Sequence, residues 1–250
     1  MIWFTSDLHF FHDRILEFHP KRKELFGNTV EKAKEAMIQL WNSRVNKKDT
    51  VYILGDLAFG EVEDKRKLFQ RLNGNKVLIL GNHDKIPDHL KCYFNHITQI
   101  KNIKFKKSIY NFLYKDLEII MCHFPILSWE HKDKGSVMIH GHCHGKVDQI
   151  NIDSKELRVD VGIDGNLANY DLISLEKLSK YLKNMKLEKL KKYRNIITTS
   201  TYLFIYILFV IVFVANIIAG TKVQDMDIVS LICTIVSGTT LSLEIYSNLN

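Results

Sequence analysis

Residues 1–172 are predicted to form an α/β fold, because short apolar runs alternate with helical patterns along them. The apolar runs are MIWFTSD, TVYILGD, KVLILGN, LEIIMCH and SVMIHGH. Each is typical of a buried strand that delivers a polar side chain at its carboxyl end. Ligands bind at the carboxyl ends of strands in α/β sheets, so the same runs predict where a functional site lies.

The segments between the runs support this assignment. TVEKAKEAMIQLWNSRV (29–45) and EVEDKRKLFQRL (61–72) have helical spacing, whereas residues 100–122 favour two antiparallel strands joined by a lysine-rich turn. The chain has 250 residues and is 46% hydrophobic, which is enough for one domain with a buried core and an appendage. We place the end of the domain at residue 172, where a long basic helix begins.

The positive charge of the chain is concentrated in one segment. The formal net charge is +7, and residues 177–194 alone hold eight Lys/Arg and one Glu, which also sum to +7. The remaining residues are therefore neutral in sum. A protein that binds nucleic acid through its phosphate backbone needs a basic surface, so this distribution argues against a nuclease without excluding a local basic channel.

The C-terminal segment is predicted to enter a membrane. Residues 195–221 contain no charged side chain and exceed the ~20 residues that cross a bilayer, which predicts a span at about 199–220. A second uncharged run, at residues 228–243, predicts a second span at about 228–246 that would return across the membrane. The basic helix at 173–194 would contact anionic lipid, and the positive-inside rule would keep the catalytic domain in the cytoplasm. Four cysteines without a disulfide pattern agree with a reducing compartment, and small residues in the second run favour a homo-oligomer.

Metal-binding residue types follow the predicted strands. The set comprises Asp7, His9, Asp56, Asn82, His83, Asp84, His123, and the histidines of HGHCHG (140–145). Carboxylates, an amide oxygen and imidazoles are ligands for divalent metal ions, and their number exceeds what one ion uses. Two ions that share a carboxylate would use the whole set. The neighbouring glycines permit sharp turns and a close approach of the backbone.

These motifs resemble those of the calcineurin-like metallophosphoesterase superfamily. The order D-x-H, GD, GNHD, H and GHxH runs from Asp7 to His144, and WNSRVNKKDTVYILGDLAFG is similar to a small bacterial and phage branch. The resemblance covers roughly residues 1–175. It implies a four-layer αββα sandwich and a metal-dependent phosphoesterase acting on a phosphate-ester substrate.

The resemblance also implies roles for individual residues. One ion would be held by Asp7, His9, Asp56 and His144, and the other by Asp56, Asn82, His123 and His142. His83 would protonate the leaving oxygen or stabilise the equatorial charge of the phosphate, and Asp84 would orient its ring. We expect Mn²⁺ first, with Fe, Zn²⁺ and Ni²⁺ as alternatives that also suit mixed oxygen and nitrogen ligands. Many relatives have a further aspartate where this chain has Phe59.

Several assignments stay open at this point. His12 and Arg14 could reach the substrate phosphate or belong to a solvated helix start, and His140 could support a ligand. Cys143 is expected to pack on the opposite face of its strand. Two further functions compete with the membrane-anchored phosphoesterase: a metal-dependent nuclease, and a two-span membrane effector, as in bacterial defence, whose metal domain handles a nucleotide signal.

Overall fold

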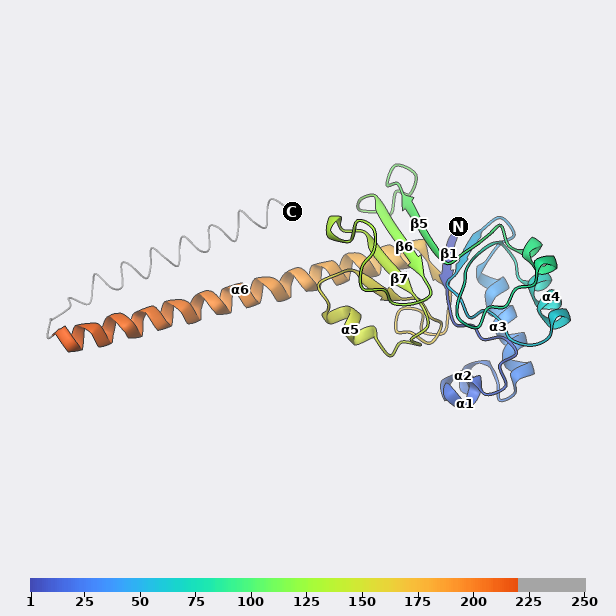
Figure 1. Cartoon of the computed structure of the whole chain (residues 1–250), viewed down its shortest axis with the longest axis horizontal. Coiled ribbons are helices and arrows are strands. Elements are labelled where there is room, and N and C mark those ends of the chain that lie inside the picture. Colours follow the sequence, from blue (N-terminus) through green and yellow to red (C-terminus); the bar gives the residue numbers. More distant parts are fainter. Residues whose placement is uncertain (220–250) are drawn as a thin grey trace. The chain divides into compact units, whose positions relative to one another are not determined.

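The computed structural model describes residues 1–219, and its first compact unit is Met1–Glu188. Two β-sheets form the centre of this unit (Figure 1). The first has the order β4-β3-β2-β1-β9, and the second has the order β5-β6-β7-β8. The α/β prediction is therefore confirmed, with mixed sheets.

The first sheet is built from three of the predicted strands and two short ones. The strands are β1 (Ile2–Thr5), β2 (Thr50–Ile53), β3 (Asn75–Ile79), β4 (His96–Thr98) and β9 (Ile173–Ser174). β1, β2, β3 and β4 pair in parallel, and β9 pairs antiparallel with β1. The parallel register brings the carboxyl ends of β1, β2 and β3 to the same edge of the sheet.

The second sheet carries the remaining predicted strands. It consists of β5 (Ile100–Phe105), β6 (Leu117–Cys122), β7 (Val137–His140) and β8 (Arg158–Asp160). β5 and β6 are antiparallel, as the sequence predicts for residues 100–122. β6, β7 and β8 are parallel, so the loops that follow β6 and β7 leave from one edge.

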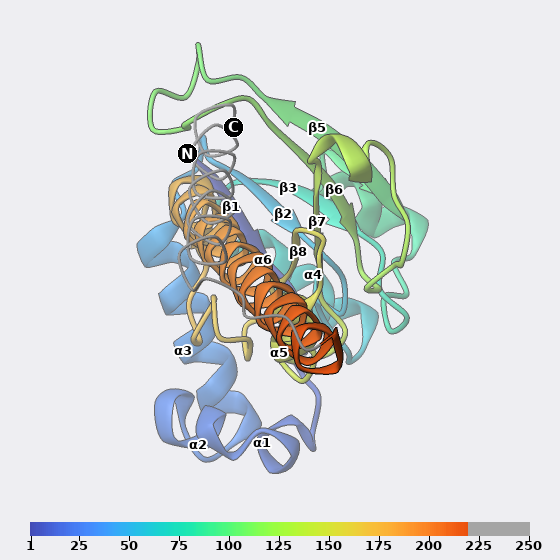
Figure 2. The same ribbon diagram turned by 90° about the vertical axis from the view of Figure 1, so that its left-hand side faces the viewer.

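Apolar packing joins the sheets and their helices into layers. One core cluster contains Phe4 and Leu54 from the first sheet together with Ile119 and Ile139 from the second, so it fills the space between the sheets. A second cluster lies on the other face of the first sheet, against α3 (Val30–Arg44) and α4 (Val62–Arg71). Figure 2 shows the two sheets from a second side. Three layers of the expected αββα sandwich are thus present.

Short helices complete this unit. α1 (Ile15–Phe18) and α2 (Pro20–Phe26) follow β1, two short 3-10 helices (Asp88–Tyr93 and Lys132–Lys134) lie in loops, and α5 (Asp148–Asp153) contacts β8. Within residues 1–188, the segment between β7 and β8 supplies one helix, α5, which packs on the second sheet. Because α5 has six residues, the fourth layer of the expected sandwich measures less than two helical turns.

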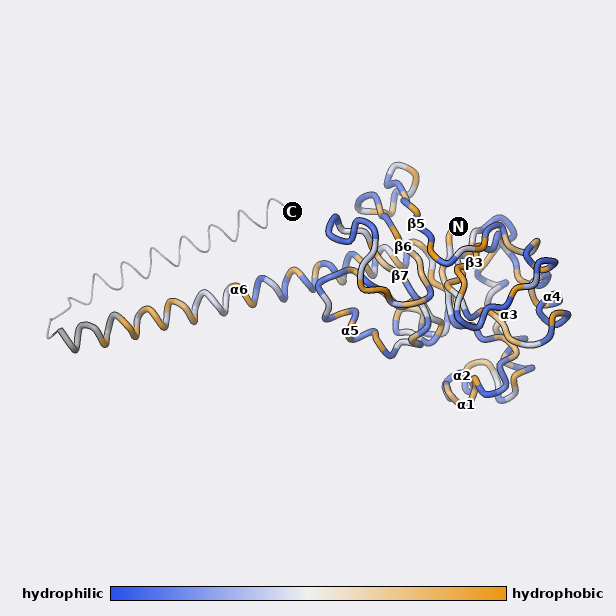
Figure 3. The backbone as a smooth tube through the Cα atoms, in the orientation of Figure 1, coloured by the Kyte–Doolittle hydropathy of each residue, from blue (hydrophilic) through white to orange (hydrophobic). Residues whose placement is uncertain are grey.

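The C-terminal helix changes character along its length. α6 (Leu175–Ala219) begins with Leu178, Leu182 and Met185 buried in the core of the first unit, so that unit extends beyond the predicted boundary at residue 172. Figure 3 shows α6 passing from a hydrophilic to a hydrophobic stretch.

The predicted membrane spans do not gain support from this helix. α6 joins a charged half and an apolar half in one element, and within residues 1–219 no helix is both long and apolar enough to cross a membrane. The span expected at about 199–220 is therefore not supported. The span expected at about 228–246 lies outside the described residues.

Candidate metal centre

Loops from both sheets converge on one group of side chains. We call this group the His/Asp cluster; its members are Asp7, His9, Asp56, Asn82, His123, His142 and His144. The loops after β1 and β2 are joined by backbone hydrogen bonds, in which the amides of Asp7 and His9 donate to the carbonyls of Gly55 and Asp56, both over 3.0 Å. The strand ends thus bring together side chains that are far apart in the sequence.

The first half of the His/Asp cluster surrounds Asp7. Nε2 of His9 lies 4.0 Å from Oδ1 of Asp7, and Nε2 of His144 lies 3.8 Å from the same oxygen. Nε2 of His9 is also 3.6 Å from Oδ2 of Asp56. Asp7, His9 and His144 offer ligand atoms within the reach of a single ion, as expected for the first predicted ligand set.

The second half of the cluster surrounds His123. Its Nε2 lies 3.6 Å from Oδ2 of Asp56 and 3.0 Å from Oδ1 of Asn82. Its Nδ1 lies 2.7 Å from the carbonyl oxygen of Leu54, to which an Nδ1–H donates. This hydrogen bond fixes the tautomer and leaves the Nε2 lone pair directed into the cluster. The ring of His142 lies next to that of His123, with 5.1 Å between ring centroids.

Asp56 belongs to both halves. Its Oδ1 accepts a hydrogen bond of 3.0 Å from the backbone N–H of His83, which fixes the carboxylate. Its Oδ2 is the atom that lies 3.6 Å from Nε2 of both His9 and His123. A carboxylate placed between two imidazoles in this way is suited to bridge two metal ions.

His9 shows most directly that this site fits a metal ion. The residue is only 6% exposed, and neither of its ring nitrogens has a hydrogen-bond partner among the described residues. Burial and the nearby positive charges of His144 and Arg22 lower its pKa to about 2, so the ring is neutral. A buried imidazole with two unsatisfied nitrogens is costly, and a metal ion would satisfy its lone pair.

The backbone of the cluster is held in an unusual conformation. Five of its members have positive φ angles: Asp7 (58°), His9 (52°), Asp56 (52°), His142 (68°) and His144 (51°). Such conformations cost about 1 kcal/mol or more for residues other than glycine, and they gather at functional sites. The expected role of the glycines is also confirmed, since a Cβ at Gly81 would collide with the carboxylate of Asp56.

An arginine–aspartate pair that the sequence did not suggest supports His144. Oδ2 of Asp164 lies 2.6 Å from Nδ1 of His144, and both oxygens of Asp164 accept hydrogen bonds from Arg22, over 2.8 and 2.6 Å. Arg22 is 1% exposed and also donates to the carbonyls of Asp7 and Leu8. The buried guanidinium therefore connects the loop after β1 to the residue that orients His144.

The ionised forms of Asp164 and His144 stabilise each other. Burial opposes ionisation of Asp164, but its hydrogen bonds with His144 and Arg22 outweigh that effect and lower its pKa. Burial likewise lowers the pKa of His144, but Asp164 and Asp7 outweigh it and raise the pKa. The Nδ1 of His144 is thus held as a donor, which leaves Nε2 facing Asp7.

Asp84 lies between the loops that follow β2 and β3 and is bound to backbone amides of both. Its carboxylate accepts hydrogen bonds from the backbone amides of Asp56 (2.8 Å), Leu57 (2.9 Å) and Gly81 (2.9 Å). No hydrogen bond joins it to the ring of His83 in the described part of the chain. Asp84 thus fastens the loops after β2 and β3 together, and its role in orienting the ring of His83 stays a prediction.

Phe59 lies beside the His/Asp cluster and contacts two histidines that the sequence singled out, His12 and His83. His12 and His83 lie close to the cluster, because the ring of Phe59 contacts both of them (centroids 4.6 and 5.0 Å apart) and stacks on His9 (5.5 Å). The guanidinium of Arg14 pairs with Glu17 and covers the ring of Phe18, which contacts the ring of His12 (centroids 5.9 Å apart). Contact of His12 and Arg14 with the substrate stays a prediction.

His140 and Cys143 lie outside the ligand set. Nε2 of His140 accepts from the side-chain amide of Asn151 over 3.0 Å, so Nδ1 carries the proton that it donates to the carbonyl of Gly141 over 2.8 Å. His140 therefore packs on α5 and supports no ligand side chain directly. Burial, together with the charges of Asp160 and Asp7, raises the pKa of Cys143 to about 11, so its thiol stays protonated.

Two packed β-sheets with a His/Asp cluster at their strand ends are the arrangement expected of an α/β enzyme that uses divalent metal ions. A family model described as "Metallophos: Calcineurin-like phosphoesterase" matches residues 1–181. The chain belongs to the calcineurin-like phosphoesterase family and is a metallophosphoesterase, as the sequence predicted. Members of this family bind divalent metal ions, and the His and Asp groups described above are the candidate ligands.

Individual relatives come from phages and archaea. The Gene 66 protein of Mycobacterium phage L5 is 28% identical over 200 residues, covering 69% of this chain and 93% of the phage protein. The uncharacterized protein MJ1445 of Methanocaldococcus jannaschii is 32% identical over 191 residues, covering 74% of this chain and 93% of that protein. The crystal structure of the protein AQ665 from Aquifex aeolicus matches the fold with a TM-score of 0.54 at 24% identity, covering 72% of this chain and 98% of that one.

Proposed function

We propose that this protein hydrolyses a small phosphomonoester or phosphodiester at a dinuclear metal centre. The observation that carries the proposal is the position of Oδ2 of Asp56, 3.6 Å from Nε2 of both His9 and His123. One carboxylate oxygen that faces two imidazoles from different loops is expected where two ions share a ligand. The unsatisfied ring of His9 supports the same conclusion.

The chain offers a complete set of ligands for each ion. Asp7, His9, Asp56 and His144 would hold the first ion, and Asp56, Asn82, His123 and His142 the second. Divalent ions at these positions would neutralise phosphate charge and lower the pKa of an attacking water. Mn²⁺ is the ion we expect, and Fe, Zn²⁺ and Ni²⁺ are the alternatives for ligands of this mixed kind.

His83 is the proposed proton donor to the leaving group. Its ring is exposed and lies 5.9 Å from the ring of His9 and 5.0 Å from that of Phe59, measured between centroids. Its backbone N–H is bound to Asp56, so the chain holds the residue at the edge of the cluster while its ring stays free of the ligand sets. An imidazole at that position can donate a proton to a leaving oxygen.

A substrate panel tests this proposal. The purified full chain is loaded with Mn²⁺ and incubated with cyclic nucleotides, dinucleotides, phosphomonoesters, phospholipid head groups, and single-stranded DNA and RNA. We expect turnover of a small phosphoester and little cleavage of nucleic acid, because the chain outside residues 177–194 is neutral in sum. Cleavage of nucleic acid alone would establish the nuclease alternative.

We propose a reducing compartment for the catalytic domain. Cys92, Cys122 and Cys143 are free thiols in the structure. Unpaired cysteines suit a compartment in which disulfides do not persist. Fractionation of cells that express the full chain or residues 1–188 tests where the protein resides, and it also tests whether the residues after 188 retain the protein in the membrane fraction.

A further inference from the structure

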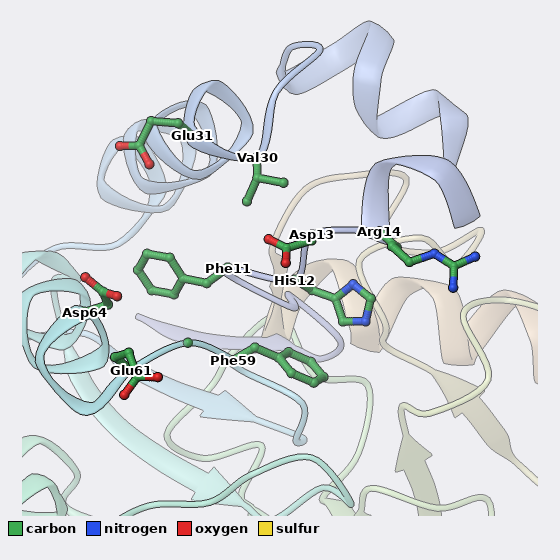
Figure 4. Close-up of a pocket in the computed structure, with 10 residues that line it drawn as sticks. Phe11, His12, Asp13, Arg14, Val30, Glu31, Phe59, Glu61 and Asp64 are labelled. Atoms are coloured by element: carbon green, nitrogen blue, oxygen red, sulfur yellow. The ribbon is translucent and has the colours of Figure 1, made fainter.

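A pocket adjoins the His/Asp cluster and shares an aromatic wall with it. We call it the Phe59 pocket; it has a volume of about 740 Å³ and is lined by Phe11, His12, Asp13, Arg14, Val30, Glu31, Phe59, Gly60, Glu61 and Asp64 (Figure 4). Phe59 stacks on His9 on one side and contacts His12 edge-on. Both lining residues thus contact the candidate ligand His9, since the ring of His12 also lies 5.6 Å from that of His9.

The charges around the pocket favour a cation. Glu31 pairs with Lys34, and Arg14 pairs with Glu17, so these two lining residues are balanced by partners. The carboxylates of Asp13, Glu61 and Asp64 make no hydrogen bond or ion pair with any other described residue. Three carboxylates without an ion-pair partner in the described chain repel a polyanion and attract a positively charged group.

The aromatic residues of the pocket suit the same kind of ligand. Phe11 has a φ of 62°, a conformation that is uncommon for a bulky residue and that gathers at functional sites. Its ring already accepts a cation, since Nζ of Lys34 lies 5.3 Å from the ring centroid. In Figure 4, Phe11 lies between Asp64 and Asp13, and Phe59 lies beside His12. Aromatic faces together with carboxylates are the groups that recognise organic ammonium ions.

We propose that the Phe59 pocket binds an organic ammonium group of the substrate, so that the preferred substrate is a phosphoester of an amino alcohol. This inference rests on the proposed phosphoesterase function and specifies its substrate class. The phosphate would lie at the His/Asp cluster, and the ammonium group would lie beyond Phe59 among Asp13, Glu61 and Asp64. A polyanionic substrate such as nucleic acid would meet these carboxylates unfavourably.

A matched pair of substrates tests the inference. p-Nitrophenyl phosphorylcholine and p-nitrophenyl 3,3-dimethylbutyl phosphate have the same leaving group and nearly the same shape, but only the first carries a positive charge. With the Mn²⁺-loaded full chain, we expect kcat/KM to favour the choline ester by about 10-fold, the order of one desolvated cation–aromatic contact. The double variant Glu61→Gln/Asp64→Asn should lower this ratio toward one. Asp133→Asn, which removes an exposed carboxylate from a different loop, should keep the wild-type ratio.

The outcomes test the role of the Phe59 pocket separately from the phosphoesterase function. Equal hydrolysis of both esters, or a preference that the double variant leaves unchanged, overturns the role of the pocket while the phosphoesterase function stands. Failure to hydrolyse either ester or any member of the substrate panel, by protein with bound Mn²⁺, contradicts the phosphoesterase function and this inference with it. Saturation-transfer NMR with choline and the metal-free chain adds a readout that is independent of turnover: binding that the double variant weakens is expected, and no binding counts against the pocket.

Discussion

Nδ1 of His144 lies 2.6 Å from Oδ2 of Asp164. The hydrogen bond orients an imidazole of the candidate metal centre, and Arg22 in turn fixes Asp164 by donating to both of its carboxylate oxygens. Partners of this kind set the tautomer and the direction of a ligand histidine. Asp164 is therefore expected to act through His144, without contacting the substrate.

The first prediction concerns this pair. Asp164→Asn should weaken Mn²⁺ binding by about 10- to 100-fold, because the histidine loses its charged partner while the amide still accepts a hydrogen bond from Arg22. Isothermal titration of the metal-free protein measures the affinity. Asp171→Asn is the matched control, since Asp171 also pairs with an arginine, Arg44, but on the exposed surface. Unchanged Mn²⁺ affinity in Asp164→Asn would refute the orienting role.

The second prediction separates the two roles considered for Asp84. Its carboxylate accepts three backbone hydrogen bonds, and an amide oxygen cannot replace both carboxylate oxygens. Asp84→Asn should therefore lower the free energy of unfolding by about 1–3 kcal/mol, the cost of leaving a buried amide unsatisfied. Urea unfolding of the metal-free protein measures this change. A large loss of kcat at unchanged stability would instead favour the orientation of His83.

The central strands and the candidate ligands could be predicted from the sequence, whereas the short strands could not. The strands of the centre were predictable because each is a run of apolar residues bounded by turn residues, and the cluster followed because its members end those runs. β4, β8 and β9 were not predicted, since strands of two or three residues carry too little periodicity. Their pairing depends on tertiary contacts.

Arg22 and Asp164 were missed for a related reason. They are 142 residues apart, and Arg22 lies in a basic stretch, PKRKELF, that is typical of a solvated helix. A weak signal was VDVGIDG, in which Asp164 follows the alternating apolar residues Val159, Val161 and Ile163. The backbone hydrogen bonds of Asp84 were missed because a sequence motif does not indicate whether a carboxylate faces a side chain or a backbone amide.

The third prediction tests His83 as the proton donor. His83→Ala should retain the bound metal ions and lower kcat by about 10²- to 10⁴-fold, because the substitution keeps the backbone N–H that binds Asp56 and removes only the ring. Metal analysis and steady-state kinetics are measured on the same preparation. His89→Ala, which removes an exposed histidine from the 3-10 helix Asp88–Tyr93, should behave as the wild type. Loss of an ion from His83→Ala would show that His83 is a ligand.

The fourth prediction links metal binding to pH. Burial raises the pKa of Asp7 to about 7 in the metal-free protein, so a proton that an unfolded aspartate loses near pH 3.9 stays bound in the fold. The folded state binds more protons over this range, so this group's contribution to stability falls as the pH rises from about 4 to about 7.

Metal binding must displace the same proton. Titrations in buffers of different ionisation enthalpy should therefore show more protons released per chain at about pH 6 than at about pH 8. The raised pKa of His144 adds to the release in the same direction, whereas His9, with a pKa of about 2, adds none. Equal proton release at both pH values would contradict the raised pKa of Asp7.

The most direct test of the dinuclear centre is the number of Mn²⁺ ions bound per chain, measured with turnover in the wild type and in Asp56→Asn. Oδ2 of Asp56 faces both His9 and His123, so two ions are expected in the wild type. The asparagine variant should lose at least one ion, and its turnover should fall by about 10³-fold or more, as for the loss of several kcal/mol of transition-state stabilisation. A single ion in the fully active wild type, or near wild-type turnover in Asp56→Asn, would contradict the shared-carboxylate mechanism.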